Sequence, residues 1–134
     1  MRERRALQIS IAIAASLPVA AGLWGILQGV AGHGGWADNH HRYQSGLLLA
    51  IGLGYWSTVH AIEAMGARLR LLTALVVVGG GARLLGIALG DAPTPVVLAS
   101  LAMELGTAPL LCLWQSCVIA RSRRVSPHLR HIAP

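Results

Sequence analysis

Four long apolar blocks limit what this chain can fold into. They cover about residues 7–30, 46–64, 69–89 and 95–120. The hydrocarbon core of a bilayer is about 30 Å thick and takes about 20 helical residues to cross. A backbone in lipid must satisfy its own hydrogen bonds, and the blocks lack the strict two-residue alternation of barrel strands. The sequence therefore predicts a single all-α transmembrane domain over residues 1–134, with four spans and a basic C-terminal tail at 121–134.

The composition agrees with a membrane protein. Hydrophobic residues make up 54% of the chain and charged residues only 12%, which is too few to cover a soluble domain of this size. A cleaved signal peptide is the alternative for the first block, because three arginines precede it. The apolar run continues past Pro18 to Gln28, which is longer than the apolar region of a signal peptide.

The arginines predict how the spans are oriented. With four spans, nine of the 11 basic residues fall on one side, at Arg2, Arg4, Arg5, Arg68, Arg70, Arg121, Arg123, Arg124 and Arg130. Cytoplasmic ends carry such an excess, so both termini are expected on the cytoplasmic side of the membrane. These charges lie close to span ends, where they set topology and contact anionic lipids. Membrane lipids are therefore the expected partners, and nucleic acid is not.

The connections between the blocks predict the packing. The inner connection at about 66–68 is short, which makes spans two and three adjacent and antiparallel. The outer turn at 90–95 offers Asp91 or Thr94 as a helix cap before Pro95. The first outer loop, at about 32–44, is the longest connection. We expect an antiparallel four-helix bundle with the N- and C-termini on the cytoplasmic side.

Two charges inside the spans are the first candidates for a site. Arg83 and Glu104 each lie about 12 to 14 Å from the outer turn, at an axial rise of about 1.5 Å per residue, so they can meet as an ion pair. An unpaired charge at that depth costs at least about 2.5 to 3.5 kcal/mol. Arg42 and Asn39 could extend the network toward the same acid, and Gln28 lies on the small-residue side of span one. The pair is either an internal clamp or the floor of an outward-facing pocket.

Helical periodicity groups further residues with this pair. Gly79, Gly86 and Gly90 share the side of Arg83. In the last span a common face is predicted for Ser100, Glu104, Thr107, Leu111 and Gln115.

Histidines and a second acid are weaker candidates. His60 and Glu63 lie one turn apart and could form a proton-accepting couple. The alternative is that Glu63 reaches the interface near Arg68 or Arg70 while His60 packs in the core. A metal could gather in the outer loop at His33, Asp38, His40 and His41, but this spacing matches no closed zinc signature. Bis-histidine haem would need a second histidine in mid-span, so we expect no metal and no cofactor.

Three segments resemble a known family. They are Asn39-His40-His41-Arg42-Tyr43, Gly79-Gly80-Gly81-Ala82-Arg83-Leu84, and Glu104-Leu105 followed by Pro109 and Trp114. Together they resemble the bacterial four-helix membrane proteins grouped as domain of unknown function 4345, over Leu27 to Trp114. The resemblance implies the four-span fold and marks Asn39, Arg42, Arg83 and Glu104 as the family-type polar set. It implies no activity.

The sequence favours a non-enzymatic role. No nucleophile-base pair or cofactor motif is recognisable, so the first hypothesis is an accessory subunit of a larger membrane complex, or a scaffold, including a homo-oligomer. The alternative is a small carrier or binding protein for a hydrophobic or anionic small molecule, held between the helices. An intramembrane enzyme would have only His60 and Glu63 as a candidate couple.

Overall fold

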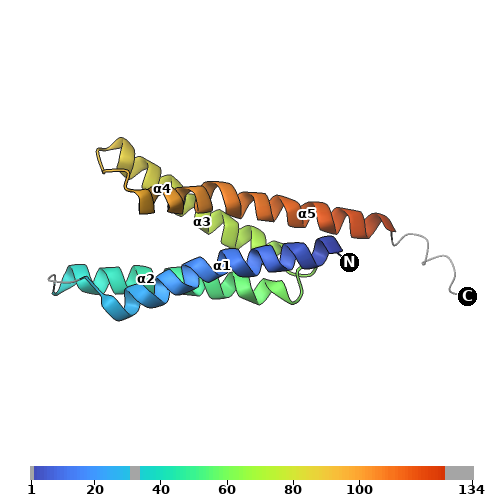
Figure 1. The fold of residues 1–134 in the computed structure, drawn as a ribbon, viewed down its shortest axis with the longest axis horizontal. Helices are drawn as coiled ribbons and strands as arrows, with labels where there is room; N and C mark the ends of the chain where they lie inside the picture. Colours follow the sequence, from blue (N-terminus) through green and yellow to red (C-terminus); the bar gives the residue numbers. More distant parts are fainter. Residues whose placement is uncertain (1, 31–33, 126–134) are drawn as a thin grey trace, which may run out of the picture. The chain divides into compact units, whose positions relative to one another are not determined.

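The part of the chain that the structure describes is helical. The structure is a computed structural model that describes residues 2–30 and 34–125, with side chains as far as Arg121. Its elements are α1 (Arg2–Gln28), α2 (Trp36–Val59), α3 (Gly66–Ala88), α4 (Pro95–Leu101), η1 (Ala102–Thr107) and α5 (Ala108–Val125), the last three being one continuous rod (Figure 1). Within these residues the all-α prediction is confirmed. His33 and residues 126–134 of the predicted tail lie outside them, whereas residues 121–125 of that tail belong to α5.

Three of the described helices are long and apolar enough to cross a membrane. They are Arg2–Gln28, Gly66–Ala88 and the rod from Pro95 to Arg121. Helix α2 is not among them, because its first ten residues, WADNHHRYQS, are mostly polar. The second of the four predicted spans therefore stays a prediction.

Helix α2 also differs from the sequence prediction in where it begins and ends. The predicted span covered 46–64 and the predicted outer loop 32–44, whereas the helix begins at Trp36 and ends at Val59. Residues 60–64 form turns that lead into α3. Apolar runs show where a helix is hydrophobic, not where its backbone becomes helical, so hydropathy missed the polar first turns of α2.

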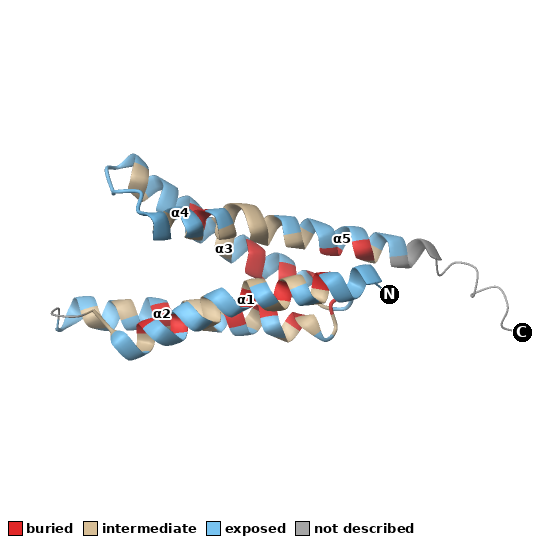
Figure 2. Cartoon of the chain, in the orientation of Figure 1, coloured by how far each residue is buried: buried red, intermediate tan, exposed pale blue. Residues whose placement is uncertain are grey.

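The chain divides into two compact units. One consists of residues 9–60 and is called here the α1–α2 unit; the other consists of residues 1–8 and 61–134 and is called the α3–α5 unit. Figure 2 shows that buried residues occupy limited parts of the helices, while much of the helical surface is exposed. Exposed leucines, isoleucines and valines are numerous, as expected where lipid replaces water around apolar helices.

Glycines bring the two helices of the α1–α2 unit into backbone contact. A Cβ atom at Gly22 would lie 2.5 Å from the backbone nitrogen of Leu49, and one at Gly52 would lie 2.9 Å from that of Val19. Further along, the Trp56 indole donates a 3.0 Å hydrogen bond to the Ala12 carbonyl. Residue numbers in these contacts fall along α1 as they rise along α2, so the two helices run antiparallel. They form a tightly packed hairpin.

The α3–α5 unit is a second hairpin, closed by the turn before Pro95. Gly90 adopts a φ of 116°, which favours glycine. The Thr94 hydroxyl then accepts a 3.4 Å hydrogen bond from the Val97 amide, so Thr94 rather than Asp91 is the cap of α4. Leu69 and Leu72 of α3 are buried in this unit, as are Leu101 and Val118 of the rod.

A π-helical turn interrupts the rod between α4 and α5. It covers Ala102–Thr107, and the amide of Ala108 donates to the Met103 carbonyl five residues earlier. Pro109 follows at once and has no amide hydrogen to give to the preceding turn. One extra residue is accommodated in this turn, so residues after it no longer share the α-helical register of Glu104.

Candidate functional site

Arg83 and Glu104 form an ion pair between α3 and the π-helical turn. The Arg83 Nε lies 3.1 Å from Glu104 Oε2 and 3.2 Å from Oε1, so one N–H is shared between both carboxylate oxygens. The Glu104 side chain is 17% exposed and that of Arg83 is 42% exposed. The acid is thus mostly covered, while part of the guanidinium faces outward.

Local structure explains how these two side chains meet. Gly80 lies one turn before Arg83, and a Cβ atom there would be 2.7 Å from the Leu105 side chain and 3.1 Å from Glu104 Cβ. The missing side chain lets the π-helical turn approach α3 closely. At this close approach, the side chain of Glu104 is long enough to reach the guanidinium of Arg83.

The ion pair uses only the Nε group of the Arg83 guanidinium. Its terminal nitrogens, Nη1 and Nη2, have no hydrogen-bond partner among the described residues. Together they carry four N–H donors. The pair is therefore balanced in charge but incomplete in hydrogen bonding.

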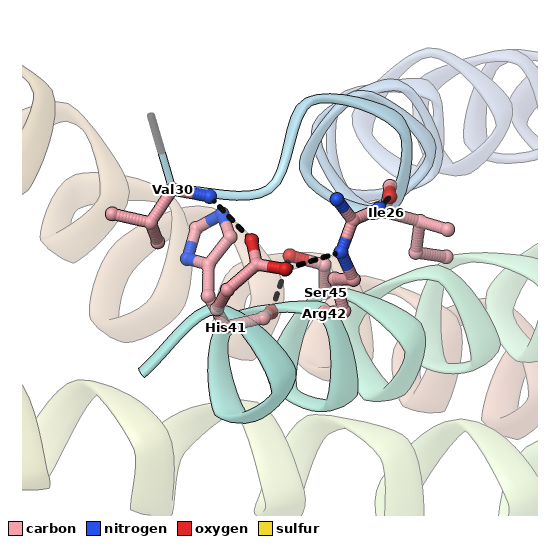
Figure 3. A network of polar contacts seen from close by, with 6 residues as sticks. Ile26, Val30, His41, Arg42 and Ser45 are labelled. Atoms are coloured by element: carbon pink, nitrogen blue, oxygen red, sulfur yellow. Dashed lines mark hydrogen bonds and ion pairs between the residues drawn. The ribbon is translucent and has the colours of Figure 1, made fainter. Parts of the chain in front are cut away.

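Arg42 belongs to a different cluster, within the α1–α2 unit. Its Nε donates to Asp38 Oδ2 at 3.0 Å, and its Nη1 donates to the Ile26 carbonyl at the end of α1. Asp38 Oδ1 also accepts a 2.8 Å hydrogen bond from the Val30 amide. Figure 3 shows His41 and Arg42 directed from α2 toward the end of α1. This cluster fastens the last turn of α1 to the first turns of α2.

A glycine makes this fastening possible. Gly29 ends α1 with a φ of 62°, and its amide donates to the Gly25 carbonyl at 3.1 Å. A Cβ atom at Gly29 would collide with Asp38 Oδ1. The carboxylate partner that the structure gives Arg42 is Asp38. The predicted extension of the network from Arg42 and Asn39 to Glu104 is not tested by this contact and stays a prediction.

The Asp38 cluster predicts a dependence of stability on acid. The Val30 amide, and then Arg42, hold the pKa of the Asp38 carboxyl below its ordinary value of 3.8. Because the pKa of Asp38 is lower in the folded state than in the unfolded state, its ionised carboxylate stabilises the fold at pH values above the unfolded-state pKa. This stabilisation is lost as the pH falls through the folded-state pKa. We expect Asp38→Asn to lower the melting temperature at pH 7 and to lower it less at pH 3, measured by circular dichroism in detergent. A difference in melting temperature that is as large at pH 3 as at pH 7 would contradict this.

The other predicted site residues lie outside both clusters. Asn39 and Gln28 are exposed. His60 is exposed in the turn after α2, so it does not pack in the core. Glu63 forms an ion pair with Arg4 at 3.6 Å within the α3–α5 unit, a different partner from the predicted Arg68 or Arg70. The same unit holds an ion pair of 2.8 Å between Glu3 and Arg121.

Gln115 is a buried polar residue that the predicted site did not include. Its side chain is fully buried, and its Nε2 donates a 2.5 Å hydrogen bond to the Ile62 carbonyl in the turn before α3. Its Oε1 has no partner among the described atoms. Periodicity had placed it on the face of Glu104, and its polarity in an apolar block was the signal. The π-helical turn separates it from that face.

No group of three or more potential metal ligands occurs in the described residues. His40 stacks on Trp36 instead, with ring centroids 4.9 Å apart.

Helices long and apolar enough for a bilayer, with an ion pair held between two of them, define a helical membrane protein. The family model of a domain of unknown function (DUF4345) matches residues 6–115, and the chain belongs to this family. The match contains both the Asp38–Arg42 cluster and the Arg83–Glu104 pair. No curated protein and no solved structure matches the chain.

Proposed function

We propose that this protein is a non-enzymatic accessory subunit or scaffold of the bacterial inner membrane. The observation that carries the proposal is the Arg83–Glu104 ion pair, in which the carboxylate of Glu104 neutralises the charge of Arg83 within the protein. A pair whose acid is mostly covered by the protein supports a role in the specificity of helix packing rather than in reactivity. Glu63 is engaged by Arg4, which leaves His60 without the acid that a proton-accepting couple would need.

The proposed architecture is an antiparallel bundle of four spans with both termini in the cytoplasm, α2 being the second span. Reporter fusions at each end test it. A cytoplasmic fluorescent protein should be active at both termini, and a periplasmic phosphatase at neither. Termini on opposite sides of the membrane would show that the chain has an odd number of spans. The proposal that α2 is the second of four spans would then be wrong.

The accessory role is tested by purification in mild detergent at native expression level. Light scattering corrected for bound detergent should give a mass above that of a monomer, at 14.1 kDa, with a partner or a second copy in fixed ratio. Cys117 is free and exposed on α5, so a thiol cross-linker applied in intact membranes offers an independent check. A monomer by both measurements would contradict the proposal.

A second function is favoured by the open side of Arg83. Its side chain is 42% exposed and two of its nitrogens have no partner among the described residues, as a floor for a bound small molecule requires. The protein would then be a binding protein or carrier for a hydrophobic or anionic molecule.

A further inference from the structure

The terminal nitrogens of Arg83 and the open strip beside Gly79 define the chemistry of a ligand. Resting on the second proposed function, we propose that this place on α3 binds a neutral, largely apolar molecule through a carbonyl oxygen. The argument has three steps, which concern charge, hydrogen bonding and space.

The charge of the site argues against an anion. Glu104 already neutralises Arg83 at 3.1 Å. An anionic ligand would bring a net negative charge about 12 Å below the outer turn, where an uncompensated charge is costly. A neutral ligand leaves the pair balanced.

The hydrogen bonding of the site calls for acceptors. Arginine has five N–H donors and no acceptor, and Glu104 receives only the one on Nε. The remaining four have no protein acceptor in the described residues. Acyl chains supply none, whereas a carbonyl oxygen has two lone pairs and can accept from both terminal nitrogens.

Gly79 provides the space. It lies four residues before Arg83, which places it on the same face of α3. No heavy atom outside its own helix stretch lies within 4 Å of the position of a Cβ atom there. The body of an apolar molecule can therefore lie along this strip while its carbonyl meets the guanidinium.

Gly81 is a matched control. It is just as open, with nothing within 4 Å of its Cβ position. Two residues before Arg83, it points about 200° away around the helix. Gly79→Leu should fill the strip, and Gly81→Leu should add the same side chain elsewhere, with no atom within 4 Å of the new Cβ in either variant.

The test uses the full chain in nanodiscs of diether lipid, which contain no ester carbonyl. Binding of decanoylglycerol is compared with that of decylglycerol, its ether analogue without the carbonyl, and with decanoate. We expect the ester to bind at least about tenfold more tightly than the ether, as for one hydrogen bond to a charged group. Gly79→Leu should weaken ester binding about tenfold, while Gly81→Leu and Arg121→Gln should leave it unchanged.

Each other outcome has a distinct meaning. Equal binding of ester and ether, or equal effects of the two leucine variants, would overturn the carbonyl site. Tighter binding of decanoate that is lost in Arg83→Leu/Glu104→Leu would overturn the ligand class but retain the binding function. Failure of all three probes to bind would overturn both.

The source of the carbonyl is resolved by changing the bilayer. In diester nanodiscs, a decrease in ester affinity would identify a bilayer lipid as the occupant. An unchanged affinity would identify a freely diffusing molecule.

Discussion

Replacing Glu104 with leucine is expected to destabilise the protein by about 2.5 to 3.5 kcal/mol, the cost of leaving a single charge in the apolar part of a span. Arg83 has no other carboxylate partner among the described residues. The free energy of unfolding in mixed micelles, titrated with sodium dodecyl sulfate, measures the effect.

The double variant Arg83→Leu/Glu104→Leu separates charge from packing. Removing both groups leaves no charge to bury, so most of the lost stability should return, as buried pairs replaced together by apolar residues often show. If the double variant is as unstable as Glu104→Leu, the carboxylate acts through packing and the electrostatic account is wrong.

Gly22→Ala is expected to separate α1 from α2. The new Cβ atom would lie 2.5 Å from the Leu49 nitrogen and 2.7 Å from the Ser45 carbonyl oxygen, both of which are backbone atoms that cannot rotate away. Overpacking of this kind costs about 1 to 3 kcal/mol. The unfolding free energy of the purified protein measures it.

Gly46→Ala is the control for this prediction. Gly46 lies in α2, and a Cβ atom there would meet nothing within 4 Å. Alanine favours helix by about 1 kcal/mol over glycine, so this variant should be at least as stable as the parent. Similar losses from both variants would show that the hairpin does not depend on close backbone approach.

The sequence predicted the helices because each apolar block is long and uninterrupted. It also placed Arg83 and Glu104 at one depth, since both lie a countable number of residues from the same outer turn. The structure pairs them at 3.1 Å. Counting residues works here because the helical rise is constant over short distances.

Other features could not be read from the same patterns. Asp38 and Arg42 are four residues apart, the spacing of neighbours on a helix, but this signal counts only once α2 is known to begin at Trp36. The π-helical turn at Ala102–Thr107 has no periodic signature, and only Pro109 hints at it. The contact of Gln115 with Ile62 joins residues far apart in the sequence, which local patterns do not reveal.

The π-helical turn decides which residues of α5 face inward. Because it holds one surplus residue, deleting a single residue from Ala102–Thr107 would restore ordinary helical winding and leave the residues of α5 facing as they do now. If the same residues were instead wound as an ordinary α-helix, with none deleted, all of α5 would rotate by about 100°, and Gln115 would turn away from Ile62. The inner and outer sides of the last helix are thus fixed by the length of one turn, whatever the residues that follow it.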